Sequence, residues 1–147
     1  MVRLLIPIIN ACVVTEAVRH ATVLSKNTRD VTVELLEILP PPDQGRVVAF
    51  HSISDQRADE LRAGEAAVLA SRAMLSQANI LFTLTRVFGI PEQIIAAFVR
   101  EHECNAVLID TSSPNAFRTL SLVTRIWRLT TIPITLLHAA KGSASEN

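Results

Sequence analysis

The sequence predicts an α/β fold, a three-layer α/β/α sandwich around a five-stranded parallel sheet. Short runs of branched apolar residues, typical of strands covered on both faces, alternate along the chain with longer amphipathic segments. Repeated strand–helix–strand units give a parallel sheet with right-handed crossovers. With 147 residues, 49% of them hydrophobic, we expect one domain over residues 1–140 and a polar, frayed tail at 141–147.

Five segments are predicted to be strands: residues 2–9, 31–39, 80–88, 105–109 and 134–138. Proline lacks the N–H that a sheet needs, so Pro7 should mark a loosening of pairing near the first strand's end and Pro133 should open the last strand. Three prolines at 40–42 should end the second strand in a stiff linker. Residues 45–53 could add a short extended piece over the sheet edge.

Four segments are predicted to be helices, the first at residues 12–26. The second should start at Ser54 or Asp55 and reach about residue 79, with Glu65 and Arg72 interrupting its apolar stripe. The third should begin at Pro91, which a first helical residue tolerates, and bury His102. The fourth should run over residues 116–129 behind an Asn115 cap. Its inward residues should be Phe117, Leu120, Val123 or Thr124, and Trp127.

Charge and cysteine content exclude several classes of protein. Lys+Arg and Asp+Glu are balanced at 14 each, so the basic surplus of nucleic-acid binders is missing. No apolar run approaches the roughly 20 residues that span a bilayer, and we expect a cytoplasmic protein. Cys12 and Cys104 should lie about one strand length apart, too far for a disulfide, and without a CxxC motif we expect no zinc site.

Several segments together resemble the universal stress protein family. They are Leu5-Ile6-Pro7-Ile8, Gly89-Ile90-Pro91 with Ile95 and Glu101, Asn105-Ala106-Val107-Leu108-Ile109 before a hydroxyl-rich turn and a helix, and Pro133-Ile134-Thr135-Leu136-Leu137. The resemblance covers about residues 2–138. It implies strand order 3-2-1-4-5 and, as in many family members, dimerisation through the last strand.

The family's ATP-binding branch has a recognisable site, and this chain departs from it. Where that branch carries aspartate, glycine and a small hydroxyl residue after the first strand, this sequence has Ile9, Asn10 and Ala11. The branch carries G-x-x-G-x9-G-[S/T] after the fourth strand. Here Asp110 and Ser113 replace the first two glycines, and Leu120-Ser121 matches only the final hydroxyl.

The same segments outline a degenerate ligand cleft with two interpretations. Its candidate residues are Asn10, Asp110, Thr111, Ser112, Ser113 and Ser121. They could bind a polar ligand or a cation, or they could be ordinary turn and helix-capping residues. Asp110 would place a negative charge where a triphosphate would lie, while glycines would expose backbone N–H groups to it. We therefore expect no cofactor, with ATP or AMP as the alternative.

The remaining candidates suggest packing or association. His20 and His102 lie on apolar stripes with no catalytic partners, so we expect no catalytic residues. Arg118, Arg125 and Arg128 could form a solvated face or dock an acidic partner. The last strand should be an edge that pairs with its own copy through Ile134, Leu136 and His138. The sequence thus favours a non-enzymatic stress or regulatory homodimer. A nucleotide sensor or slow ATPase, and a protein-binding adaptor, are the alternatives.

Overall fold

The computed structural model describes residues 1–28, 30–40, 53–112 and 116–138, with backbone alone for 53–61, 63 and 116–119. Five parallel strands form one sheet in the order β3-β2-β1-β4-β5, which confirms the predicted topology. The strands are β1 (Val2–Ile9), β2 (Val31–Leu39), β3 (Leu81–Phe88), β4 (Ala106–Asp110) and β5 (Ile134–Leu137).

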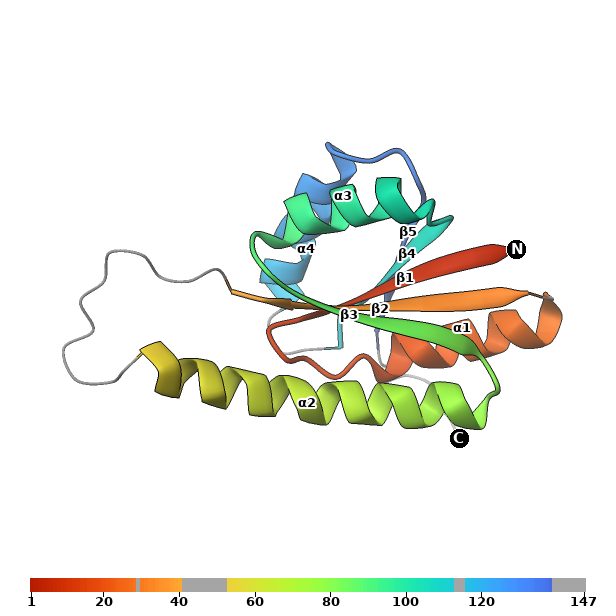
Figure 1. Cartoon of the computed structure of the whole chain (residues 1–147). Coiled ribbons are helices and arrows are strands. Elements are labelled where there is room, and N and C mark those ends of the chain that lie inside the picture. The colour runs from red at the N-terminus through yellow and green to blue at the C-terminus, as the bar shows by residue number, and fades with distance from the viewer. Residues whose placement is uncertain (29, 41–52, 113–115, 139–147) are drawn as a thin grey trace, which may run out of the picture.

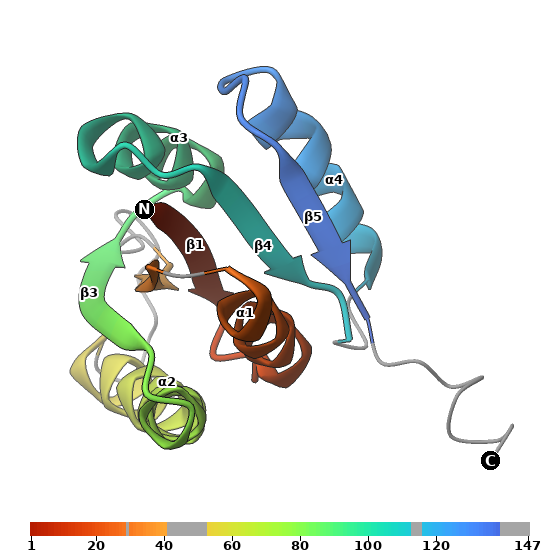
Figure 2. The same ribbon diagram turned by 90° about the vertical axis from the view of Figure 1, so that its right-hand side faces the viewer.

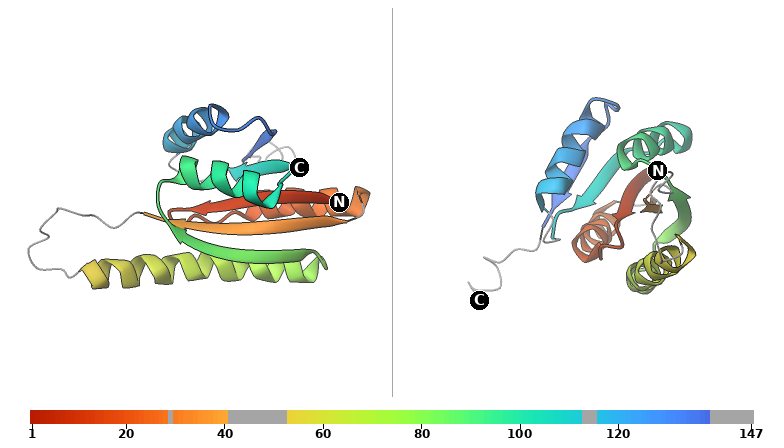
Figure 3. Two further views of the ribbon diagram at one scale, coloured as in Figure 1. Left: turned by 45° about the horizontal axis from the view of Figure 1, so that its top comes forward. Right: turned by 90° about the vertical axis from the view of Figure 1, so that its left-hand side faces the viewer.

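Four helices complete the three layers: α1 (Thr15–Asn27), α2 (Ile53–Gln77), α3 (Pro91–His102) and α4 (Ala116–Trp127). Helices α1 and α2 cover one face of the sheet, and α3 and α4 cover the other (Figures 1 and 2). Both further views keep this separation (Figure 3). None of the described helices has both the length and the hydropathy that a bilayer crossing needs.

Alternating side chains of the central strand supply both cores. Leu4, Ile6 and Ile8 of β1 pack in the cluster beneath α1 and α2, whereas Leu5 packs in the cluster beneath α3 and α4. All four side chains are at most 2% exposed, as a central strand covered on both faces requires. The branched apolar run that predicted this strand therefore identified the centre of the fold.

Several predicted helix faces need correction. Helix α1 begins at Thr15, three residues later than expected. Glu65 and Arg72 are exposed, because the buried side of α2 is rotated away from them. In the described part of the helix, it is formed by Gly64, Ala67, Val68, Ser71 and Leu75, at three- and four-residue spacing.

In α3 and α4, bulky side chains were predicted inward but lie outside. His102 is exposed, with its ring stacked on Phe98 at a centroid distance of 3.9 Å. Leu120 is 48% and Trp127 is 63% exposed. Among the described side chains of α4, the buried ones are Leu122, Val123 and Ile126, so Val123 lies inward as predicted. The side chain of Phe117, also predicted inward, is outside the description. The apolar residues of α4 are distributed more widely than one stripe, so periodicity alone did not fix which of them face the sheet.

Some expectations fall outside the described residues. They are the extended piece at 45–52, the Asn115 cap, and the tail from residue 141 onward. Those expectations remain predictions.

The expected start of α2 needs correction. The helix begins at Ile53, so Ser54 and Asp55 lie inside its first turn and neither is the capping residue that precedes it.

An ion pair between β2 and β3 lies beneath α2. Glu37 of β2 is fully buried, and its Oε1 accepts a hydrogen bond from Arg86 Nε of β3 at 2.6 Å. Its other oxygen, Oε2, is buried without a hydrogen-bond partner. Gly64 of α2 lies directly against that oxygen, at a point where any Cβ would clash. The Glu37 carboxylate beneath the helix therefore explains why a residue without a Cβ stands at position 64.

Candidate functional site

The strand order reverses between β1 and β4, and ligands of open α/β sheets bind at the carboxyl end of such a switch point. Pairing of β1 with β4 stops at Leu5, although pairing with β2 continues to Ile9. The Arg3 carbonyl oxygen accepts a hydrogen bond from the Asn105 N–H. The backbone hydrogen-bonding groups of Arg3 and of every second residue after it, including Pro7, therefore point toward β4. The missing N–H of Pro7 therefore loosens pairing on the β4 side alone, earlier than predicted.

The turn that leaves β1 is held in an unusual backbone conformation. Asn10 and Ala11 have φ values of 54° and 59°, and the Cys12 N–H donates to the Ile9 carbonyl oxygen at 3.2 Å. Two central residues with positive φ make a type I′ turn. Asn tolerates this region, but Ala has no local hydrogen bond to offset its cost. The turn thus keeps a backbone suited to glycine without containing one.

Asp110 is the central residue of the site. Its Oδ2 accepts hydrogen bonds from the backbone N–H groups of Glu16 at 2.9 Å and Ala17 at 3.2 Å, in the first turn of α1. Its Oδ1 accepts another from the Ser112 N–H at 2.9 Å. Helix N-termini carry unpaired N–H groups and partial positive charge, which an anion satisfies. Here the anion belongs to the chain itself.

The sequence at the start of α1 explains why Asp110, 94 positions from Glu16, caps this helix. The N-cap residue is Val14, which offers no side-chain acceptor, and no side-chain hydrogen bond from it caps the helix. This contact was not predicted from the sequence. One sequence signal could have predicted it. The first helix starts without a capping residue, and the strand predicted to lie next to the first strand is followed by a carboxylate, Asp110.

Among the described site residues, the other side chains do not converge on Asp110. The hydroxyl of Thr111 donates to the Leu137 carbonyl oxygen at 3.0 Å, so it is used in the link to β5. Ser112 is exposed and takes part through its backbone N–H. Asn10 is exposed in the neighbouring turn. Ser113 lies outside the described residues.

Ser121 lies within α4 and contacts a different group. Its hydroxyl accepts a hydrogen bond from Arg125 Nη2 at 2.9 Å, and Arg125 Nη1 approaches Glu92 of α3 at 3.5 Å. This side chain therefore belongs to a link between α3 and α4. Of the predicted arginine stripe, Arg128 is exposed, and the side chain of Arg118 is outside the described residues.

In the described part of the chain, His, Cys, Asp and Glu side chains form no group of three that could hold a metal ion. His20 is half-buried on α1, as its apolar stripe predicted. The feature that remains is a carboxylate seated on a helix N-terminus, at the place where this class of sheet binds ligands.

A family comparison agrees with the architecture. The model of the universal stress protein family matches residues 4–143. The chain belongs to the universal stress protein family. The resemblance stated from sequence motifs is therefore confirmed, while a search of curated proteins gave no match.

Solved structures of universal stress proteins have the same fold at low sequence identity. The UspA protein of Lactobacillus plantarum has a TM-score of 0.71 and 12% identity, over 93% of this chain and 97% of that one. An Arabidopsis thaliana family protein with AMP bound has a TM-score of 0.68 and 10% identity, over 97% and 95%. An Archaeoglobus fulgidus universal stress protein in complex with dAMP scores 0.66 at 11% identity, over 93% and 98%. These likenesses show the fold.

Proposed function

We propose that this chain is a non-catalytic, cytoplasmic regulator of the universal stress type that does not bind ATP in the family manner. The observation that carries the proposal is the Asp110 carboxylate on the first turn of α1. It uses the N–H groups that could otherwise receive a phosphate oxygen. Its charge also opposes a triphosphate, since two unit charges 4 Å apart repel by roughly 4 kcal/mol at an effective dielectric constant of about 20.

The rest of the switch point supports the same proposal. In the ATP-binding branch the first strand ends in aspartate, and here that position is Ile9. Thr111 is used in the link to β5, and Ser121 in the link between α3 and α4. A nucleotide would therefore have to displace an internal cap without gaining the branch's usual ligands.

Nucleotide titration tests this function. We expect the melting temperature to stay constant with ATP, AMP or cAMP, with and without Mg²⁺, up to millimolar concentration. Ligand at 100 times its Kd would add about 2.7 kcal/mol to the free energy of unfolding, which is easily detected. Saturable stabilisation at sub-millimolar nucleotide would overturn the proposal. It would favour the second candidate, a sensor or slow ATPase using Asn10, Ser112, Ser113 and Ser121.

That second candidate rests on relatives whose solved structures contain dAMP, cAMP or AMP. A monophosphate carries less negative charge than ATP, so AMP and cAMP are its most informative probes. The protein-binding adaptor is the third candidate. Pull-down with charge reversal at Arg118, Arg125 and Arg128 tests it, because unchanged recovery of a partner would remove that surface.

We further propose a homodimer formed by antiparallel pairing of β5 with its copy, through Ile134, Leu136 and His138. In the described residues β5 pairs on one side alone, with β4, and Leu136 is 39% exposed. An apolar edge strand without a blunting charge invites pairing. Leu136→Lys should convert dimer to monomer in sedimentation experiments. Leu81→Lys, at the opposite edge strand, is the matched control, because Leu81 is 76% exposed and should not affect assembly. A monomeric wild type would contradict the dimer.

A further inference from the structure

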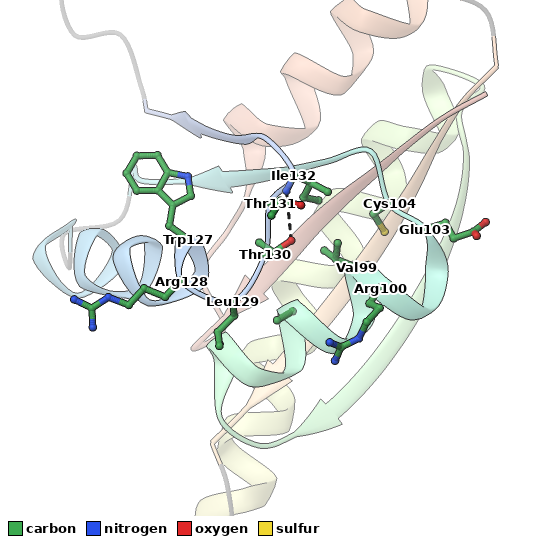
Figure 4. A pocket seen from close by; sticks show the side chains of 11 residues that line it. Val99, Arg100, Glu103, Cys104, Trp127, Arg128, Leu129, Thr130, Thr131 and Ile132 are labelled. Carbon is green, nitrogen blue, oxygen red and sulfur yellow. Dashed lines mark hydrogen bonds between the residues drawn. The ribbon is translucent and has the colours of Figure 1, made fainter.

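A second hollow lies at the other end of the sheet. It has a volume of about 490 Å³ and is formed by the last turns of α3, the turn before β4, and the end of α4 with the segment leading into β5. Figure 4 shows side chains from these elements around one space, with Val99, Cys104 and Ile132 near its middle and Trp127, Arg128 and Glu103 toward its edges. The amino ends of β4 and β5 adjoin it, whereas Asp110 lies at their carboxyl ends.

The inner lining of this hollow is apolar. Ala96, Val99 and Cys104 are between 5% and 9% exposed, and Ile132 is half-buried against the same core. Burial, and to a smaller extent the negative charge of Glu34, raise the pKa of the Cys104 thiol to about 11, an effect that Arg3 partly opposes. Cys104 is therefore a neutral thiol at physiological pH, and it contributes to an apolar lining.

The outer lining carries charged side chains. Arg100 and Arg128 are exposed, and neither forms an ion pair within the described residues. Other arginines on the same side of the sheet are paired, Arg125 with Glu92 and Arg3 with Glu34. Glu103 is the one carboxylate in the lining. Figure 4 shows the Arg128 side chain directed away from the hollow, so the guanidinium group at its edge is that of Arg100.

Taken together, these residues make a hollow with an apolar interior and one arginine, Arg100, at its edge. Its volume is within the 300–1,000 Å³ that small-molecule sites usually have. Arginine matches the planar fork of a carboxylate, and an uncharged apolar interior disfavours a polyanion such as a triphosphate. We propose that the hollow binds a small amphipathic carboxylate, with its apolar chain against Val99 and Ile132 and its carboxylate at Arg100. This site does not depend on the proposed function.

The chain provides its own reporter for a test. Trp127 is its one tryptophan, the chain has no tyrosine, and Trp127 lines the hollow. We expect decanoate, below its micelle concentration, to change the tryptophan emission saturably with one site per chain. Decanol and decyltrimethylammonium have the same chain length without a negative charge, so they should bind at least tenfold more weakly. Equal binding of decanol, or a change that does not saturate, would overturn the proposal.

Charge variants locate the site. Arg100→Gln should weaken decanoate at least tenfold. Arg19→Gln removes the same charge from an exposed position of α1 and should leave affinity unchanged. Equal weakening in both variants would reduce the effect to net charge and contradict the site. A second copy covering the hollow would make the emission depend on protein concentration and block decanoate, which would also overturn the proposal.

Ala96→Leu tests the interior independently of charge. The larger side chain should occupy part of the hollow and weaken decanoate, while far-ultraviolet circular dichroism confirms the fold. If that variant does not fold, Thr131→Phe places a ring from the exposed side of the lining and should weaken decanoate in the same way. Undiminished affinity in a folded variant would contradict binding inside the hollow.

Discussion

The two ends of the sheet differ in how their charges are used. At the carboxyl end, Asp110 accepts hydrogen bonds from α1, and Glu37 is paired with Arg86. At the amino end of β4 and β5, Arg100 and Arg128 are exposed beside a hollow of about 490 Å³. The difference teaches that a fold can keep its ligand-binding geometry while internal side chains take over the groups that a ligand would need.

The largest expected effect at the carboxyl end comes from the buried ion pair. Arg86→Met leaves the fully buried Glu37 carboxylate without its cation and should lower the free energy of unfolding by about 3 kcal/mol. Urea unfolding of the variant and the wild type measures the difference.

Its control is an exposed pair of the same length. Arg19 and Glu16 are also joined at 2.6 Å, but the Arg19 side chain is 59% exposed. Arg19→Met should therefore cost less than about 1 kcal/mol. Equal losses in the two variants would show that burial of Glu37 does not set the strength of the first pair.

The reactivity of the two cysteines provides a chemical comparison of the two ends of the sheet. With its pKa at about 11, only about one Cys104 thiol in a thousand is ionised at pH 8, and the thiolate is the reactive form. We expect iodoacetamide to modify Cys104 about a hundredfold more slowly than an ordinary thiol, and to modify the less buried Cys12 first. The rate at Cys104 should rise as pH increases toward 11. Peptide mass spectrometry follows each site, and equal rates would contradict an apolar interior at the amino end.

Removal of the internal cap should have the next largest effect. Asp110→Ala deletes the acceptor of three backbone N–H groups and should cost about 2 kcal/mol. Asp110→Asn keeps an oxygen in place without the charge and should cost less. Chemical denaturation of both variants measures the order. An unchanged free energy of unfolding in Asp110→Ala would show that α1 does not need this carboxylate.

The smallest expected effect tests the strained turn. Ala11→Gly removes the cost of a positive φ but adds freedom to the unfolded chain, so it should raise the free energy of unfolding by about 0.5–1 kcal/mol. Ala70→Gly, at an exposed position of α2, should lower it by about 1 kcal/mol. Thermal unfolding distinguishes the opposite signs. Destabilisation by both would mean that Ala11 is not strained.

Much of the architecture could be predicted because burial patterns are local. The apolar run of β1, the proline that opens α3 and the alternation of elements all depend on neighbouring residues, and the family resemblance supplied the strand order. Helix faces were less predictable. Trp127 and His102 match an apolar period, yet both are exposed. Which of several apolar faces is buried depends on how the helices pack.

The candidate site was predicted in part. Sequence reasoning identified Asp110 as the residue that departs from the family's glycine, and predicted its conflict with a phosphate. It did not identify the N–H groups of Glu16 and Ala17 as its partners, because that contact joins residues more than 90 positions apart. The hollow beside Trp127 was also missed. It joins residues of α3 with the segment before β5 and has no motif.

The most direct test of the central claim follows the amide resonances of Glu16 and Ala17 by nuclear magnetic resonance during titration with ATP. With the Asp110 carboxylate already bound to both amides, we predict no saturable change in the wild type. In Asp110→Ala, the same two amides should respond to the phosphate groups. Saturable shifts of both amides in the wild type at sub-millimolar ATP would contradict the account.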